Sequence, residues 1–169
     1  MNRLAFDNVE GSLFQLTGQL LEKGILGSLN SPRKRMILPL HRKQDAEVQR
    51  MINFLQPGTY IRPHRHPLPH ATESLVMIRG SILFITFDDS GSQLEVNPLS
   101  ALPFPGVLDI EPGVWHTFLV REPDTILFEC KKGPYDAAAD KEFAEWSPQE
   151  GSREAELWLE ERNRSVKSV

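Results

Sequence analysis

Short runs of β-branched and aromatic residues, broken by Pro, Gly and Asp, dominate the middle of the chain over residues 35–131. The eight runs are MILPL, VQRMINFL, TYIRPH, SLVMIRG, ILFITF, VLDI, TFLV and TILFEC. Each has the length of a strand, and the turn residues recur at short intervals. This pattern predicts an all-β sandwich or barrel. The turn Asp88-Asp89-Ser90-Gly91 predicts a hairpin after ILFITF, because its glycine accepts a positive φ.

Helical patterns flank this region on both sides. Ser12-Leu13-Phe14-Gln15 is a capping-box pattern, leucines follow on one helical face, and Gly24 is a natural stop. These features predict a helix over residues 13–23. On the other side we expect a short helix over residues 136–146 and a second over residues 152–162, where acids come early and arginines late, as the helix macrodipole favours.

The length of 169 residues fits one domain over residues 1–169. We expect a barrel at about 35–131, an N-terminal helical extension over 1–34 and a C-terminal helical tail over 134–169.

Charge and cysteine usage exclude several classes of protein. The net charge is −4 and no long basic run occurs, which argues against a nucleic-acid or membrane partner. The short cluster Arg33-Lys34-Arg35 is expected to be the solvated start of a strand. Cys130 is the only cysteine, so no intrachain disulfide forms and a reducing compartment is indicated. Without a signal peptide or a run of ~18 apolar residues, the sequence predicts a cytoplasmic protein.

Three of the five histidines and an acid lie close together: His64, His66, His70 and Glu73 fall within ten residues. His64 and His66 stand two apart, so on a strand both imidazoles project from the same face. Prolines on both sides of the pair exclude a helix interior. The cluster therefore indicates a metal site.

A second element combines glycine and histidine downstream. Gly106 is followed by the tight-turn pair Pro112-Gly113 and then by the run WHTFLV, which carries His116 near its start. Together the two elements resemble the paired motifs of the cupin superfamily. The first motif of that pattern is a glycine, five residues, His-x-His, three or four residues, Glu, six residues and Gly. The residues that match it are Gly58, His64, His66, Glu73 and Gly80.

One spacing departs from the pattern, because six residues separate His66 from Glu73. Either residues 67–72 contain a two-residue insertion, or His70 replaces the acid. The six residues between Glu73 and Gly80 fit the family and favour Glu73. The resemblance thus implies a metal-ligand set, with His70 in reserve: His64, His66, Glu73 and His116.

Longer segments of the sequence resemble one family within the cupin superfamily. The segments RMINFLQPGTYIRPHRH, ITFDDSG, IEPGVWHT and FECKKGPYD, followed by DKEFAEW, are similar to the WbuC-type cupin-fold metalloproteins, small bacterial proteins often linked to surface-polysaccharide gene clusters. The resemblance implies a double-stranded β-helix, or jelly roll, with a metal inside its wider mouth. It names no reaction, since this fold hosts isomerases, epimerases, dioxygenases, decarboxylases, storage proteins and sensors.

Three imidazoles and one carboxylate suit one divalent ion of Zn, Fe, Mn, Ni or Co, and on an octahedral ion they leave two positions open. If the strand is regular, Tyr60 and Arg62 share the face of the histidines, and Arg62 can receive a carboxylate or phosphate. In the alternative, Pro63 breaks this parity and Arg62 lies in solvent. Glu129 and Lys131 share one face of the last strand, where an ion pair is the default and an acid/base role for Glu129 the alternative.

Two hypotheses on function follow. The leading one is a small metal-dependent enzyme that acts on a polar or anionic small molecule such as a sugar derivative. The alternative is a non-catalytic metal- or ligand-binding regulatory module, because the sequence shows no convincing catalytic base, nucleophile or cofactor motif beyond the ion. Symmetry statistics favour a homodimer.

Overall fold

The computed structural model describes residues 4–165 of the chain. Its helices are α1 (Gly18–Asn30) and α2 (Arg153–Ser165). Its strands, in chain order, are β1 (Arg35–Pro39), β2 (Val48–Leu55), β3 (His64–Arg65), β4 (Glu73–Arg79), β5 (Ser81–Phe87), β6 (Gln93–Ser100), β7 (Val107–Ile110), β8 (Trp115–Val120), β9 (Thr125–Lys132) and β10 (Glu142–Phe143).

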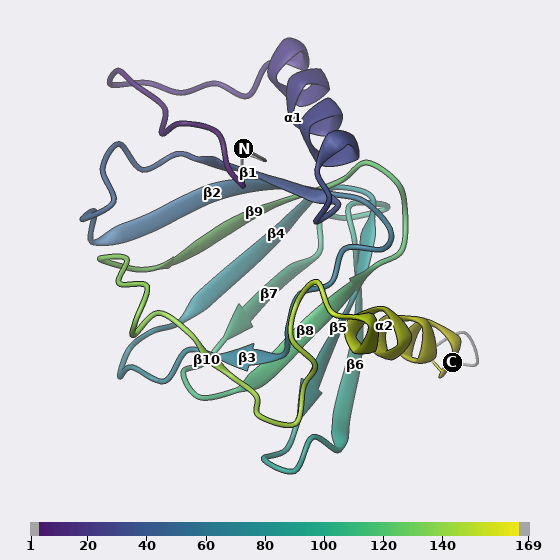
Figure 1. Ribbon diagram of the computed structural model, residues 1–169. Coiled ribbons are helices and arrows are strands. Elements are labelled where there is room, and N and C mark those ends of the chain that lie inside the picture. The colour runs from purple at the N-terminus through teal and green to yellow at the C-terminus, as the bar shows by residue number, and fades with distance from the viewer. Residues whose placement is uncertain (1–3, 166–169) are drawn as a thin grey trace.

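The strands form two antiparallel sheets of five, with the orders β1-β2-β9-β4-β7 and β10-β3-β8-β5-β6. Consecutive strands repeatedly cross from one sheet to the other, as β4 and β5 do, so the sheets face each other as two layers (Figure 1). This is the expected jelly roll. As the sequence predicts, both helices lie outside the strands that form it, with α1 over β1 and β2 and α2 beside β5 (Figure 1).

Three hydrophobic clusters stabilise the layers. One lies between the sheets and contains Leu75, Met77, Ile82 and Phe84 from β4 and β5. A second packs the outer face of the first sheet against α1, and a third packs the outer face of the second sheet against α2. Because β5 is covered on both faces, its sequence ILFITF is apolar at nearly every position instead of alternating.

The N-terminal helix differs from the sequence prediction at both ends. It begins after Thr17, whose side chain accepts a hydrogen bond from the backbone N–H of Leu20, and it continues through Gly24 to Asn30. Gly24 does not stop the helix. A Cβ atom there would lie 2.2 Å from the ring of Phe54 on β2, so the glycine lets α1 approach the sheet closely.

Two further local expectations were wrong. The run TYIRPH yields only the two-residue strand β3, where prolines at 63 and 67 lack the backbone donors that would extend the pairing. Residues 136–146 form no helix. After one turn, in which the Asp140 N–H donates to the carbonyl oxygen of Asp136 at 2.7 Å, the chain pairs as β10 with β3. This tertiary pairing overrides the local helix propensity.

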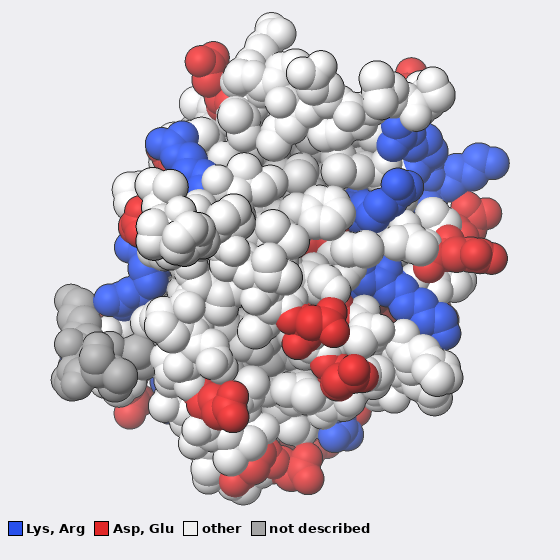
Figure 2. Space-filling view, turned by 180° about the vertical axis from the view of Figure 1, so that it is seen from behind, with Lys and Arg blue, Asp and Glu red and all other residues white. Residues whose placement is uncertain are grey.

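The C-terminal helix agrees with its prediction within a few residues. Trp158 of α2 lies edge-on to Tyr60, with ring centroids 5.7 Å apart. Within the described residues, neither helix has the length and apolar character that crossing a membrane requires. On the face shown in Figure 2, Lys and Arg side chains lie near the edges and uncharged residues cover most of the middle.

Candidate metal centre and its cavity

Both sheets contribute to a cluster of three histidines and one glutamate. His64 of β3 pairs directly with His116 of β8 in one sheet, and His66 follows two residues later. Glu73 begins β4 in the opposite sheet. The potential ligand atoms of the four residues all lie within 4.8 Å of one another, and all four side chains are buried.

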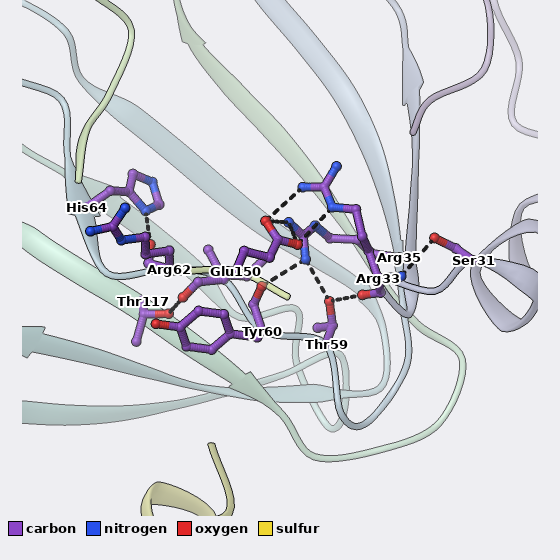
Figure 3. Close-up of polar contacts among 10 residues, drawn as sticks. Ser31, Arg33, Arg35, Thr59, Tyr60, Arg62, His64, Thr117 and Glu150 are labelled. Carbon is purple, nitrogen blue, oxygen red and sulfur yellow. Dashed lines mark hydrogen bonds and ion pairs between the residues drawn. The ribbon is translucent and has the colours of Figure 1, made fainter. Parts of the chain in front are cut away.

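Backbone carbonyl groups orient all three imidazoles in the same way. Nδ1 of His64 lies 2.9 Å from the carbonyl oxygen of Arg62 (Figure 3), and Nδ1 of His116 lies 2.8 Å from that of Val114. Nδ1 of His66 lies 2.5 Å from the carbonyl oxygen of Asp140. A carbonyl oxygen only accepts hydrogen bonds, so each Nδ1 carries the proton and each Nε2 presents a lone pair in the neutral ring.

Two of these Nε2 atoms face one carboxylate. Oε2 of Glu73 lies 3.0 Å from Nε2 of His66 and 3.4 Å from Nε2 of His116. Nε2 of His64 is buried and has no hydrogen-bond partner within the described residues. A buried polar atom without a partner is costly, and a cation held among the four groups would satisfy it.

The protonation states of the four groups also favour a bound cation. Burial, followed by the positive charge of Lys141 and the neighbouring His116, holds the pKa of His64 well below its usual value, so this ring is neutral. Burial would raise the pKa of Glu73, but the close contacts of its carboxylate with the imidazoles of His116 and His66 outweigh burial and hold that pKa well below the usual range. Neutral imidazoles and an ionised carboxylate are the forms that bind metal ions.

The donor set therefore fits a divalent first-row metal ion. Three nitrogens and one oxygen suit Zn, Fe, Mn, Ni or Co, and an octahedral ion would keep positions for water or a ligand. The carbonyl groups behind the rings fix the orientation that such ligands require.

The structure separates the other predicted site residues. His70 is exposed, in the loop between β3 and β4, with a φ of 63°, and it is not part of the cluster. The hydroxyl of Tyr60 donates to the carbonyl oxygen of Pro148 at 2.8 Å, and Tyr60 does not line the cavity described below. Arg62 does line it, and its guanidinium also donates to Ser147 Oγ and the Ala144 carbonyl oxygen, both at 3.0 Å.

A cavity of about 440 Å³ lies next to the cluster, between the inner faces of the sheets and residues 135–150. His64, Glu73 and His116 form part of its wall. The other polar or charged side chains that line it are Arg33, Arg35, His41, Gln44, Gln49, Asn53, Arg62, Glu129, Lys131, Tyr135, Asp140, Lys141 and Glu150.

Glu129 and Lys131 do not form the ion pair that strand parity suggests. Asn53 Nδ2 donates to Glu129 Oε2 at 2.9 Å. Lys131 Nζ instead lies 2.7 Å from both carboxylate oxygens of Asp140. Burial and then the charge of Glu73 raise the pKa of Glu129 to about 7.

Sequence reasoning missed several residues of the cavity. Gln49 and Asn53 alternate with Met51 on the inner face of β2, and polar residues at inward positions of an apolar strand are a signal that could have found them. Asp140 and Lys141 had no such signal, because residues 134–150 were interpreted as a helical tail. His41 is also buried and lines the cavity.

Arg35 corrects another expectation. The cluster Arg33-Lys34-Arg35 was expected to be solvated, yet Arg35 is only 6% exposed and lines the cavity together with Arg33. As the first residue of β1, Arg35 has the inward parity of Ile37 and Pro39.

A family model described as "Domain of unknown function (DUF6016)" matches residues 16–99. No curated protein matches the sequence.

Several solved structures resemble the chain. CapF in complex with the inhibitor 3-isopropenyl-tropolone has a TM-score of 0.54 at 17% identity, over 64% of this chain and 31% of that one. The capsular polysaccharide assembling protein CapF from Staphylococcus aureus has a TM-score of 0.53 at 17% identity, over 64% of this chain and 30% of that one. Oxalate oxidase with the substrate analogue glycolate has a TM-score of 0.48 at 20% identity, over 68% of this chain and 57% of that one.

This chain therefore spans about a third of the CapF chains that it matches. At these identities the likeness concerns the fold alone. Two facing antiparallel sheets, together with the structural likeness to CapF, identify the chain as a protein with the cupin-type jelly-roll fold.

Proposed function

We propose that this protein is a small metal-dependent enzyme that acts on a polar, anionic small molecule. One divalent ion is held by His64, His66, Glu73 and His116. The observation that carries the proposal is the common orientation of the three imidazoles, each with Nδ1 on a backbone carbonyl oxygen, and with Nε2 of His66 and His116 within 3.4 Å of Glu73 Oε2. The buried Nε2 of His64, which has no partner within residues 4–165, adds to it.

The charge of the cavity supports an anionic ligand. Its walls carry five basic side chains, Arg33, Arg35, Arg62, Lys131 and Lys141, and four acidic ones, Glu73, Glu129, Asp140 and Glu150. A divalent ion would raise the excess of positive charge from one to three. A cavity of about 440 Å³ has room for a molecule of monosaccharide size.

When bound, the ion would polarise a carbonyl or hydroxyl oxygen of the ligand, or lower the pKa of bound water. The chain's own groups then orient the ligand and move protons. Glu129 lines the cavity and is held by Asn53, so its carboxyl group is the candidate for accepting or donating a proton. Lys141 also lines the cavity, and within the described residues its ammonium group forms no ion pair shorter than 4 Å, so it can bind an anion.

A ligand screen on the metal-loaded protein tests this function. Sugar acids, sugar phosphates and small hydroxy acids are incubated with the wild type, with Glu129→Gln and with His116→Ala, and products are followed by NMR. The proposal expects turnover of at least one compound by the wild type, a large loss of rate in Glu129→Gln with metal retained, and none in His116→Ala. Binding without turnover by the wild type would favour the alternative, a regulatory module.

Four finer statements are part of the proposal. The motif segments support an assignment to the WbuC-type cupins, and the lone cysteine supports a cytoplasmic protein. We also propose that residues 1–169 fold as one domain and that the chain forms a homodimer, which light scattering after size-exclusion chromatography would test.

A further inference from the structure

Arg35 is a buried cation with a rigid setting. Its Nη1 donates to Thr59 Oγ1 at 3.2 Å and to the Tyr60 carbonyl oxygen at 2.8 Å (Figure 3). Thr59 is itself held, because its hydroxyl donates to the Arg33 carbonyl oxygen at 2.8 Å. The guanidinium is therefore positioned before any ligand arrives.

A single carboxylate pairs with two arginines at this place. Oε1 of Glu150 lies 2.8 Å from Arg33 Nε and 2.7 Å from Arg35 Nη2, and Figure 3 shows the carboxylate between the two guanidinium groups. One positive charge is left over in a largely buried setting. Burial and then the neighbouring Arg33 lower the pKa of Arg35 to about 10, although Glu150 opposes both effects.

The acid is held less firmly than Arg35. Glu150 lies outside any strand or helix, three residues before α2, and its side chain is 34% exposed, whereas that of Arg35 is 7% exposed. Withdrawing Glu150 requires a loop to move, but withdrawing Arg35 would break hydrogen bonds inside the fold. Glu150 is thus the replaceable member of the group.

The pair of arginines and the metal cluster share the same cavity, which Arg33, Arg35, His64 and Glu150 all line. Tyr60, whose carbonyl oxygen binds Arg35, precedes His64 by four residues. Four residues of fully extended chain span at most about 14 Å, so the arginine pair and the histidine cluster lie in neighbouring parts of one cavity, and an elongated small molecule such as a sugar phosphate or a sugar acid would extend from one toward the other.

We propose that Arg33 and Arg35 form an oxyanion subsite of this cavity, and that Glu150 occupies it as an internal stand-in until a carboxylate or phosphate group of the ligand displaces it. The proposal rests on the proposed function, in that the rest of the ligand would extend toward the metal cluster. Paired guanidinium groups match both kinds of oxyanion, and exchange of one oxyanion for another preserves the hydrogen bonds of both arginines.

Inorganic phosphate and acetate, titrated separately into the metal-loaded protein at constant ionic strength, are the probes. Calorimetry compares the wild type with Glu150→Gln, which removes the stand-in charge, and with Glu150→Asp, which keeps the charge but shortens its reach. Glu142→Gln is the matched control, because Glu142 forms a similar pair with Arg65 at 2.7 Å outside the cavity lining.

We expect Glu150→Gln to bind a probe about tenfold more tightly than the wild type, as displacing a charge-assisted hydrogen bond implies. Glu150→Asp should show a smaller gain, Glu142→Gln a change below twofold, and Glu150→Gln combined with Arg33→Gln should lose the gain. If Glu150→Gln binds acetate more tightly than the wild type does, the subsite accepts the carboxylate group of a ligand. If only phosphate binds more tightly, the subsite accepts the phosphate group of a phosphate ester.

Equal affinities in wild type, Glu150→Gln and Glu150→Asp for both probes would overturn the subsite, and so would an equal gain in Glu142→Gln. Should Glu150→Gln not fold, Glu150→Asp alone decides. Metal content is measured for each variant. A protein that binds the ion but shows no gain refutes the subsite and leaves the metal centre intact, whereas a gain in a protein without stoichiometric metal refutes the proposed function and keeps the subsite.

Discussion

Nε2 of His66 lies 3.0 Å from Oε2 of Glu73, while Nδ1 of the same ring lies 2.5 Å from the carbonyl oxygen of Asp140. In a neutral ring that donates through Nδ1, both Nε2 and the carboxylate oxygen are acceptors. Their close approach requires either a second proton on the ring or a cation between them. His116 repeats the arrangement at 3.4 Å from the same oxygen, and a metal ion resolves both contacts at once.

The two candidates for the acidic position can be separated by substitution. Glu73→Ala should abolish stoichiometric metal binding, because it removes the only carboxylate of the cluster. His70→Ala should bind metal as the wild type does, since His70 is exposed in the loop. Metal affinity measured by competition with a chelating dye checks both variants. Loss of metal in His70→Ala with retention in Glu73→Ala would reverse the assignment.

Asp140 is expected to position His66. Its carbonyl oxygen accepts from the ring, and its carboxylate pairs with Lys131 at 2.7 Å. Asp140→Asn weakens the pairing with Lys131, so the carbonyl group of residue 140 is held less rigidly against the His66 ring. We expect metal affinity to fall roughly tenfold, which is the usual scale when the hydrogen-bond partner of a metal ligand is disturbed. Glu142→Gln, two residues away and paired with Arg65, is the control. Equal losses in both variants would mean that the whole segment, and not the support of His66, governs affinity.

Stability of the metal-free protein should fall with pH below about 6.5, in part through His64. Its pKa is lowered in the fold by burial, Lys141 and His116. Below the ordinary value the unfolded chain takes up a proton that the folded ring refuses, so the unfolding free energy decreases by up to ~1.4 kcal/mol per pH unit.

His64→Asn keeps a donor for the Arg62 carbonyl oxygen but lacks this titration. The stability gap between wild type and variant should therefore shrink as pH falls from 7 to 5, measured by urea unfolding at each pH. A gap that is constant or widens on acidification would show that His64 is not held neutral.

Close packing of α1 on β2 gives a prediction about the fold. Gly24→Ala should destabilise the protein by about 1–3 kcal/mol, although alanine favours helix, because the new Cβ would lie 2.2 Å from the Phe54 ring. Gly18→Ala is the matched control, since nothing lies within 4 Å of its Cβ position, and it should be neutral or stabilising. Thermal unfolding measures both, and similar destabilisation in the two variants would contradict this account of Gly24.

The jelly roll was predictable because its signal is repeated: strand-length apolar runs such as those of β4 and β5 alternate with turns along the whole middle of the chain. The ends of helices and strands that tertiary contacts determine were not predictable. The helix pattern that suggested a stop at Gly24 cannot reveal that this glycine accommodates Phe54. Likewise, residues 136–146 have helical propensity, but pairing of Phe143 with His64 overrides it.

The cluster of three histidines and Glu73 was predictable in part because His64 and His66 stand two residues apart and the spacing from Glu73 to Gly80 resembles a known motif. The sequence could not place Tyr60, because residues 59–63 form no strand and the alternation of side chains expected for a strand does not apply to them. The Tyr60 hydroxyl donates instead to the carbonyl oxygen of Pro148. Nor could the sequence assign Arg35, because one basic residue beside two others looks the same whether it is solvated or buried.

Elemental analysis of protein purified without added metal tests the central claim most directly. The account predicts about one ion of Zn, Fe, Mn, Ni or Co per chain in the wild type, and its loss in His116→Ala, whose Nε2 faces Glu73. A folded wild-type chain without stoichiometric metal, both as purified and after incubation with each of these ions, would contradict it.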